Sequence, residues 1–133
     1  MIQIRIPFSL KDNNVNAIIR EYQKRIKLRF DIRSSDKLLD NISNFDYLIS
    51  MSPDGKNFSS KEFAKLISNK LMSYKNIIFF IGSAEGLENS IIQKSNEIIS
   101  FGKNTWPHQL CTAMLVEQIY RAEQIINNHP YDK

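Results

Sequence analysis

The sequence predicts a single α/β domain with a three-layer parallel or mixed sheet, and three observations lead to this fold class. Segments with the two-residue alternation of strands are interleaved with segments that have the spacing of amphipathic helices. Residues 77–81 are continuously apolar, as is typical of a strand covered on both faces. With 133 residues, 42% of them hydrophobic, the chain suffices for one core but hardly for two. We therefore treat residues 1–133 as one domain.

The first half of the chain is predicted to hold three strands and one long helix. Ile2, Ile4 and Ile6 alternate with polar residues up to Pro7, which indicates a strand with one face in solvent. Apolar residues recur at helical spacing over 14–26, with the basic residues on the opposite face. The pattern then predicts a strand at 28–32, a short helix or turn at 38–42, and a strand at 45–51 that ends in the turn 52–55.

The second half alternates helices with strands. Ser59-Ser60-Lys61-Glu62 is a capping box, which predicts a helix that buries Phe63, Leu66, Ile67 and Leu71. The apolar run 77–81 is the best candidate for a central parallel strand. After it we expect a helix at 87–95, a short strand at 98–101 and a final helix that starts at Pro107, because proline is favoured in the first helical turn.

The composition is typical of a soluble cytoplasmic protein. No apolar run reaches the roughly 20 residues of a membrane-spanning helix, and no signal-peptide segment follows Met1. Cys111 is the only cysteine, so we expect no internal disulfide and no metal site. We interpret its side chain as a small buried hydrophobic group.

Positive charge is concentrated near the N-terminus. Residues 1–40 contain nine Lys or Arg and five Asp or Glu, whereas residues 41–133 contain nine of each. The predicted helix at 14–26 and the strand after it carry Arg20, Lys24, Arg25, Lys27, Arg29 and Arg33. Such a dense positive surface suits a polyanion, and the alternative is an ordinary solvated helix face.

The final helix is apolar almost all round, which indicates burial on more than one side. Its apolar residues are Leu110, Cys111, Ala113, Met114, Leu115, Val116, Ile119 and Ala122. A domain of this size has little protein with which to cover such a helix, so we expect a partner subunit to do so. The alternative is an ordinary central helix.

Two polar corners precede the final helix. Gly82 and Gly86 flank three residues directly after the apolar strand, where exposed backbone N–H groups would let a ligand come close. Residues 102–107 form a second irregular loop. Neither has the spacing of a dinucleotide fingerprint or a P-loop, and each alone fits a plain connection. Together they predict a ligand cleft at the edge of the sheet.

Four motifs in this part of the chain carry a resemblance to a known family. They are Ile81-Gly82-Ser83-Ala84-Glu85-Gly86-Leu87, Thr105-Trp106-Pro107-His108-Gln109-Leu110, Glu117-Gln118-Ile119-Tyr120-Arg121-Ala122 and Asn128-His129-Pro130-Tyr131-Asp132-Lys133. From Phe45 to Lys133 the chain is similar to the ribosomal RNA large subunit methyltransferase H family of the SPOUT superfamily. The resemblance implies a C-terminal trefoil knot, a homodimer, the cofactor S-adenosylmethionine, and methylation at N3 of a pseudouridine in large-subunit ribosomal RNA on the ribosome.

The resemblance also implies which residues form the site. It places cofactor contacts on Met51, Gly82, Ser83, Gly102, Lys103, Asn104, Thr105, Trp106 and Pro107. The implied reaction is attack of N3 on the sulfonium methyl carbon, while a base or a stabilised anion accounts for the N3 proton. His129 is the candidate base, and Tyr131 is a proton relay or a stacking face. RNA contacts are expected from Arg20, Lys24, Arg25, Arg121 and Lys133.

Each of these residues also has a purely structural alternative role. His129 and Pro130 would simply end the helix with Tyr131 packed on its neighbour, Trp106 would plug its loop, and His108 would be a structural donor of the first helical turn. The chain also departs from the family pattern at Ser52, Ser83, Thr112 and Asp132, where an acidic residue, glycine, arginine and histidine are usual. These changes leave open a catalytically silent knotted dimer that binds ribosomal RNA, a SPOUT methyltransferase for another RNA, and an unrelated flavodoxin-like binding module.

Overall fold

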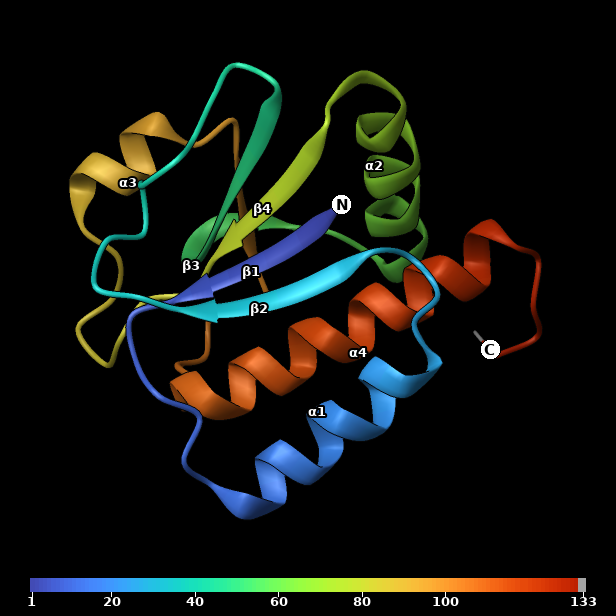
Figure 1. The fold of residues 1–133 in the computed structure, drawn as a ribbon, viewed down its shortest axis with the longest axis horizontal. Helices are drawn as coiled ribbons and strands as arrows, with labels where there is room; N and C mark the ends of the chain where they lie inside the picture. The colour runs from blue at the N-terminus through green and yellow to red at the C-terminus, as the bar shows by residue number, and fades with distance from the viewer. Residues whose placement is uncertain (132–133) are drawn as a thin grey trace.

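The computed structural model describes residues 1–131 and has a five-stranded parallel sheet with helices on both faces (Figure 1). The strand order is β2-β1-β4-β3-β5, and every neighbouring pair is parallel. The strands are β1 (Ile2–Ile6), β2 (Phe30–Ser34), β3 (Asp46–Asn57), β4 (Asn76–Phe80) and β5 (Glu97–Ser100), and the helices are α1 (Asn13–Arg25), α2 (Ser60–Ser73), α3 (Asn89–Lys94) and α4 (His108–Ile126). The predicted α/β class is confirmed.

Two unequal layers cover the sheet. Helices α1, α2 and α4 lie on one face, whereas the short α3 and the turn at 38–42 lie on the other (Figure 1). Strand β4 contributes apolar side chains to the core on both faces of the sheet. Ile77 and Phe79 belong to the larger core cluster, whereas Ile78 and Phe80 belong to the smaller one. The continuous apolar run is therefore the central strand that the sequence predicts.

Strand β1 differs from its prediction, because the expected solvent face is covered. Gln3 and Arg5 are only 4% and 7% exposed. The guanidinium of Arg5 donates from Nε to Gln3 Oε1 at 2.6 Å and from Nη1 to the carbonyl oxygens of Leu38 and Asp40 at 2.8 and 2.5 Å. These polar side chains hold the turn at 38–42 against the sheet, and desolvation lowers the pKa of Arg5.

Strand β3 is longer than predicted. Both Met51 and Lys56 pair with Ile99 of β5, so residues 52–55 form a bulge within the strand and not its end. Gly55 is needed there, because a Cβ atom would lie 2.7 Å from the backbone of Ile98. After the bulge, Ser59 and Glu62 form the predicted capping box of α2.

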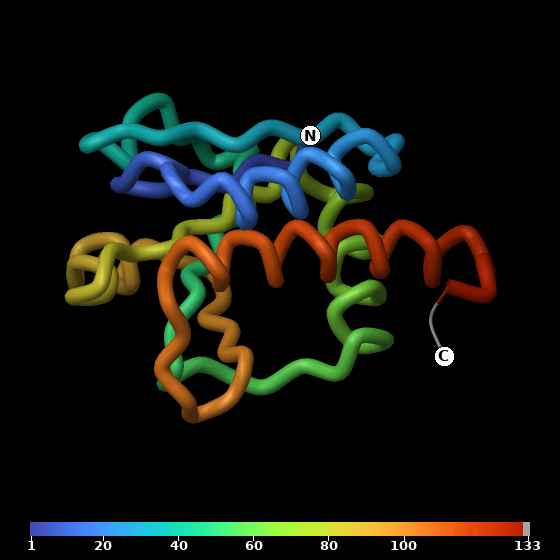
Figure 2. Tube along the Cα trace, turned by 90° about the horizontal axis from the view of Figure 1, so that it is seen from below, coloured from blue at the N-terminus to red at the C-terminus, as the bar shows by residue number. Residues whose placement is uncertain are grey.

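Helix α4 runs under the sheet, with α1 and α2 packed beside it (Figure 2). Other parts of the same chain therefore cover most of the apolar surface of α4, which agrees with the alternative interpretation of an ordinary central helix. Leu110 near its start is still 38% exposed, as is Ile126 at its end. Pro107 immediately precedes the helix and does not form its first turn. Among the described residues, no helix is long and apolar enough to cross a membrane.

Candidate ligand-binding site

A cavity of about 430 Å³ opens at the carboxyl edge of the sheet. Met51 lines it from β3 just before the bulge, Ile81 directly follows β4, and Ile99 belongs to β5, while two loops and the first turn of α4 complete the wall. Connections diverge at this edge of a parallel sheet, and the volume suits a small organic ligand. The other lining residues are Ser52, Pro53, Gly82, Ser83, Ala84, Gly86, Phe101, Gly102, Asn104, Thr105, Trp106, Pro107, His108 and Cys111.

The structure brings eight of the nine predicted contact residues into this lining. Lys103 is the exception, because it is exposed on the loop and does not border the cavity. Sequence reasoning missed the contributions of His108 and Cys111. Their positions one and four residues after Pro107 put them in the first helical turn on the cavity side, and this spacing could have indicated them.

The geometry of the turn after β4 gives Gly82 a structural role, in addition to the ligand contact that the sequence predicts. A Cβ atom at Gly82 would lie 2.4 Å from the carbonyl carbon of Gly86 and 2.6 Å from the nitrogen of Leu87. Gly86 has φ of 87° and donates its N–H to the oxygen of Ser83 at 2.9 Å. The closed form of this turn therefore requires Gly82, whereas Ser83 is exposed and borders the cavity.

The second loop is folded by its own hydrogen bonds. The Ser100 hydroxyl donates to the carbonyl of Gly102 at 2.7 Å and accepts its N–H at 2.9 Å. Gly102 has φ of 105°, which favours glycine. Trp106 is 39% exposed, and its indole N–H lies 3.4 Å from the carbonyl oxygen of Phe101. The indole thus borders the cavity and closes the loop at the same time.

The first turn of α4 has no side-chain cap. The ring of His108 meets Phe8 edge-on at 4.3 Å between centroids, and its carbonyl accepts the hydroxyl of Thr112 at 2.9 Å. Thr112 is fully buried, so the position where the family usually has arginine is here a satisfied core hydroxyl. Burial raises the pKa of the Cys111 thiol to about 11, which makes it a neutral lining group at physiological pH.

The candidate catalytic residues of the tail do not border the cavity. They follow the far end of α4, whose 19 residues span ~28 Å at 1.5 Å per residue. His129 is exposed, and its Nδ1 accepts the N–H of Tyr131 at 3.2 Å. The Tyr131 hydroxyl donates to Glu117 Oε1 at 3.0 Å, so this ring packs back on its own helix. Lys133 lies outside the described residues.

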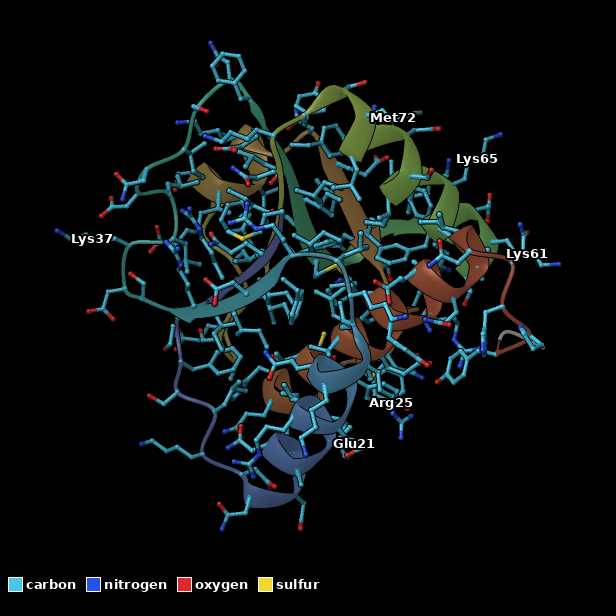
Figure 3. All side chains as sticks on the ribbon, turned by 45° about the vertical axis from the view of Figure 1, so that its right-hand side comes forward. Glu21, Arg25, Lys37, Lys61, Lys65 and Met72 are labelled. Carbon is cyan, nitrogen blue, oxygen red and sulfur yellow. The ribbon has the colours of Figure 1, made fainter. Side chains whose placement is uncertain are left out.

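The predicted basic face is exposed but partly neutralised. Arg20, Lys24 and Arg25 all lie on the surface of α1. Arg25 pairs with Glu21 at 2.8 Å, and both are about half exposed (Figure 3). Arg121 pairs with Glu117 at 2.6 Å in a more sheltered position on α4.

Comparison with known proteins identifies the class to which this fold and cavity belong. Residues 29–132 match the family described as "Predicted SPOUT methyltransferase". A probable methylase family protein from Haemophilus influenzae Rd KW20 superposes with a TM-score of 0.63 over 99% of this chain and 70% of that one, at 15% identity. A probable methyltransferase from Bordetella pertussis Tohama I has a TM-score of 0.60 over 91% and 95%, at 11% identity. The protein is thus of the SPOUT methyltransferase class, and these two structures bear on its fold alone.

Sequence relatives narrow the class. Ribosomal RNA large subunit methyltransferase H of Acholeplasma laidlawii is 38% identical over 137 residues, covering 93% of each chain. The protein of that name from Streptococcus uberis is 40% identical over 149 residues, covering 93% of this chain and 94% of its own. One from Limosilactobacillus reuteri is 44% identical over 103 residues, covering 76% and 64%. The chain belongs to the ribosomal RNA large subunit methyltransferase H family, as its motifs predict.

Proposed function

We propose that this protein is an S-adenosylmethionine-dependent methyltransferase that acts at N3 of a pseudouridine in large-subunit ribosomal RNA on the assembled ribosome. The observation that carries the proposal is the cavity at the carboxyl edge, framed by the two loops that the sequence singles out. The relatives support the substrate class, because their name describes methyltransferases of large-subunit ribosomal RNA.

The lining fits this cofactor. Met51, Ile81 and Phe101 offer apolar surface for a purine, while the hydroxyl, amide and backbone groups of the two loops suit a carboxylate and an ammonium group. Among the described residues, the lining contains no Lys, Arg, Asp or Glu. When bound, S-adenosylmethionine supplies the methyl group on its sulfonium. The loops would hold it mainly through neutral donors and acceptors.

We infer that the active form is a cytoplasmic homodimer with a C-terminal trefoil knot. Within one subunit, the back-folded tail cannot deliver His129 to the cavity, whereas a second subunit related by a two-fold axis could. An apolar groove of about 280 Å³ supports this inference. It is lined by Ile18, Tyr22, Phe101, Leu110, Ala113, Met114, Glu117 and Gln118, of which Ile18 and Leu110 are markedly exposed. The knot remains a prediction of the family.

In this proposal, the residues of the tail have different roles in catalysis and positioning. Because Nδ1 of His129 accepts the N–H of Tyr131, the neutral ring carries its proton on Nε2, so Nε2–H would donate a hydrogen bond that stabilises the uracil ring as its N3 proton leaves to water. Burial, followed by hydrogen bonds with Tyr22 and Glu117, raises the pKa of Tyr131 well above its ordinary value. Tyr131 therefore stays neutral, which favours a stacking or anchoring role over a proton relay. Arg20, Lys24, Arg25, Arg121 and Lys133 are the proposed RNA contacts.

The first test is cofactor binding, followed by reaction with RNA. Calorimetry with S-adenosylmethionine and S-adenosylhomocysteine should give micromolar binding, and nucleoside mass spectrometry of treated ribosomes should detect a methylated pseudouridine. No binding at millimolar ligand would favour the silent RNA-binding dimer. Methylation of tRNA in place of ribosomes would favour a SPOUT enzyme for another RNA.

A further inference from the structure

The two C-terminal sequence motifs contact each other in the folded chain. Glu117 belongs to the motif within α4, and Tyr131 belongs to the tail after it. Oxygen Oε1 of Glu117 accepts the Tyr131 hydroxyl at 3.0 Å and the Arg121 Nε and Nη2 groups at 2.9 and 2.6 Å. The other oxygen, Oε2, accepts the Gln118 amide at 3.0 Å. Both oxygens of the carboxylate are thus engaged.

Aromatic packing adds to this hydrogen bond. The Arg121 guanidinium lies 4.8 Å from the centre of the Tyr131 ring, and Tyr120 meets that ring edge-on at 4.9 Å between centroids. Tyr22 of α1 continues the cluster at 5.6 Å from Tyr120. The tail is therefore packed against two helices as well as hydrogen-bonded to one residue.

The backbone before Tyr131 is turned back by a helix-ending motif. Asn128 has φ of 57° and donates its N–H to Ile125 O at 3.1 Å, while His129 donates its N–H to Gln124 O at 2.8 Å. These two bonds form a Schellman motif with asparagine in the left-handed position. His129 thus lies between two fixed points, the helix end and the Glu117 contact.

The Glu117–Arg121 pair is better suited to anchoring than the similar pair on α1. Side chains of Arg121 and Glu117 are 25% and 20% exposed, against 49% and 54% for Arg25 and Glu21, although both pairs have the same helical spacing. A sheltered carboxylate needs a positive partner and full hydrogen bonding. Arg121 supplies the positive partner, and the same carboxylate oxygen accepts the hydroxyl of the tail.

We propose that Glu117 is the positioning residue of the tail, holding residues 127–131 through the Tyr131 hydroxyl so that His129 occupies one defined place. The inference rests on the proposed function, in which this tail serves the partner's cavity. A side chain that stabilises the deprotonated ring must lie within hydrogen-bond reach of it. A tail released from Glu117 would sample many positions, and misplacement by about 1 Å can cost a factor of about 100 in rate.

The test compares Glu117→Ala, Glu117→Gln and Tyr131→Phe in the full chain. Glutamine keeps an acceptor oxygen and should retain most activity. Alanine and the Tyr131→Phe change should each lower kcat roughly 10-fold or more, leave the KM for S-adenosylmethionine within about 2-fold, and show no further loss when combined. Glu21→Ala is the matched control, since it removes the exposed pair on α1. It should leave kcat unchanged.

Hydrogen exchange of residues 124–131 supplies a readout that is independent of catalysis. Glu117→Ala and Tyr131→Phe should speed exchange at the His129 and Tyr131 amides by roughly 10-fold, and Glu21→Ala should not. Wild-type kcat in Tyr131→Phe, or unchanged tail exchange in Glu117→Ala, overturns the proposal. If Glu117→Ala fails to fold, Tyr131→Phe decides. If the wild type methylates no ribosomal RNA, the proposed function fails and exchange alone judges the anchor.

Discussion

The two ends of α4 are built in opposite ways. At its start, no side chain caps the helix, and the surrounding loops present neutral groups to an open cavity. At its end, a Schellman motif satisfies the last carbonyls, and an ion pair with three tyrosines packs the tail onto the helix. The start of the helix leaves room for a ligand, whereas the polar groups at its end form hydrogen bonds and an ion pair that hold the tail in place. The predictions below test this division, from the largest expected effect to the smallest.

Gly82→Ala should have the largest effect, because the cavity at the start of α4 is partly walled by a turn that cannot accept a Cβ atom at this position. We expect a loss of roughly 2–4 kcal/mol in the free energy of unfolding, measured by urea denaturation, and the loss of ligand binding. Ser83→Ala is the control, since Ser83 is exposed, and it should change stability by less than about 0.5 kcal/mol. A fully stable Gly82→Ala that still fails to bind would return Gly82 to a ligand-contact role.

Cys111 tests the neutral character of the cavity. With its pKa raised to about 11 by burial, the thiol stays protonated at pH 8 and only ~0.1% is thiolate. Alkylation by iodoacetamide should be roughly 100-fold slower than for a free cysteine and should rise about 10-fold per pH unit up to about pH 10. S-adenosylhomocysteine should slow it further, because Cys111 lines the cavity. Rapid alkylation at pH 7 would contradict the burial at this end of the helix.

Trp106→Ala should weaken cofactor binding with little change in stability. Trp106 borders the cavity yet is 39% exposed, and loss of one stacking partner costs about 1–3 kcal/mol, which is roughly 5- to 150-fold in affinity. Trp106 is the only tryptophan, so the fluorescence of the wild type reports binding directly. Phe45→Ala at the opposite edge of the sheet is the control and should bind normally. Unchanged affinity in Trp106→Ala would leave the indole as a loop plug.

Lys24→Gln with Arg25→Gln should have the smallest effect. Both residues end α1 beside the tail end of α4, and Arg25 is already partly neutralised by Glu21. We expect RNA binding to weaken only a few-fold at physiological salt, with the slope of log K against log salt reduced by about one to two. The same changes at Lys61 and Lys65 on the outer side of α2 serve as the control (Figure 3). Equal slopes in both variants would make the α1 face an ordinary solvated surface.

Four departures from the family pattern bear differently on the site. Ser83 is accommodated because it is exposed where it borders the open cavity, and Thr112 is buried with its hydroxyl hydrogen-bonded. Ser52 borders the cavity as a neutral group. Asp132 lies outside the described residues. The changes at the first three positions therefore leave the cavity intact, which supports the enzyme over the silent RNA-binding dimer.

The sequence by itself determined the order of the elements and the two loops of the cavity. Strand and helix periods are local patterns, and both loops directly follow buried strands, so their common edge follows from a parallel sheet. The same holds for the capping box of α2, which is complete within four residues. Eight of the predicted contacts therefore line the cavity, and only Lys103 on the exposed loop does not.

Only the tertiary structure decided what covers each face and which distant residues meet. The polar side of β1 is buried because β1 lies between β2 and β4 and is covered by a turn that Arg5 holds. The residue pattern of a strand does not reveal which strands and turns lie next to it in the sheet. Gly82 is explained by atoms four and five residues away in a closed turn. The contact of Glu117 with Tyr131 requires the chain to reverse at Asn128, so two motifs that read separately in sequence become one cluster in space.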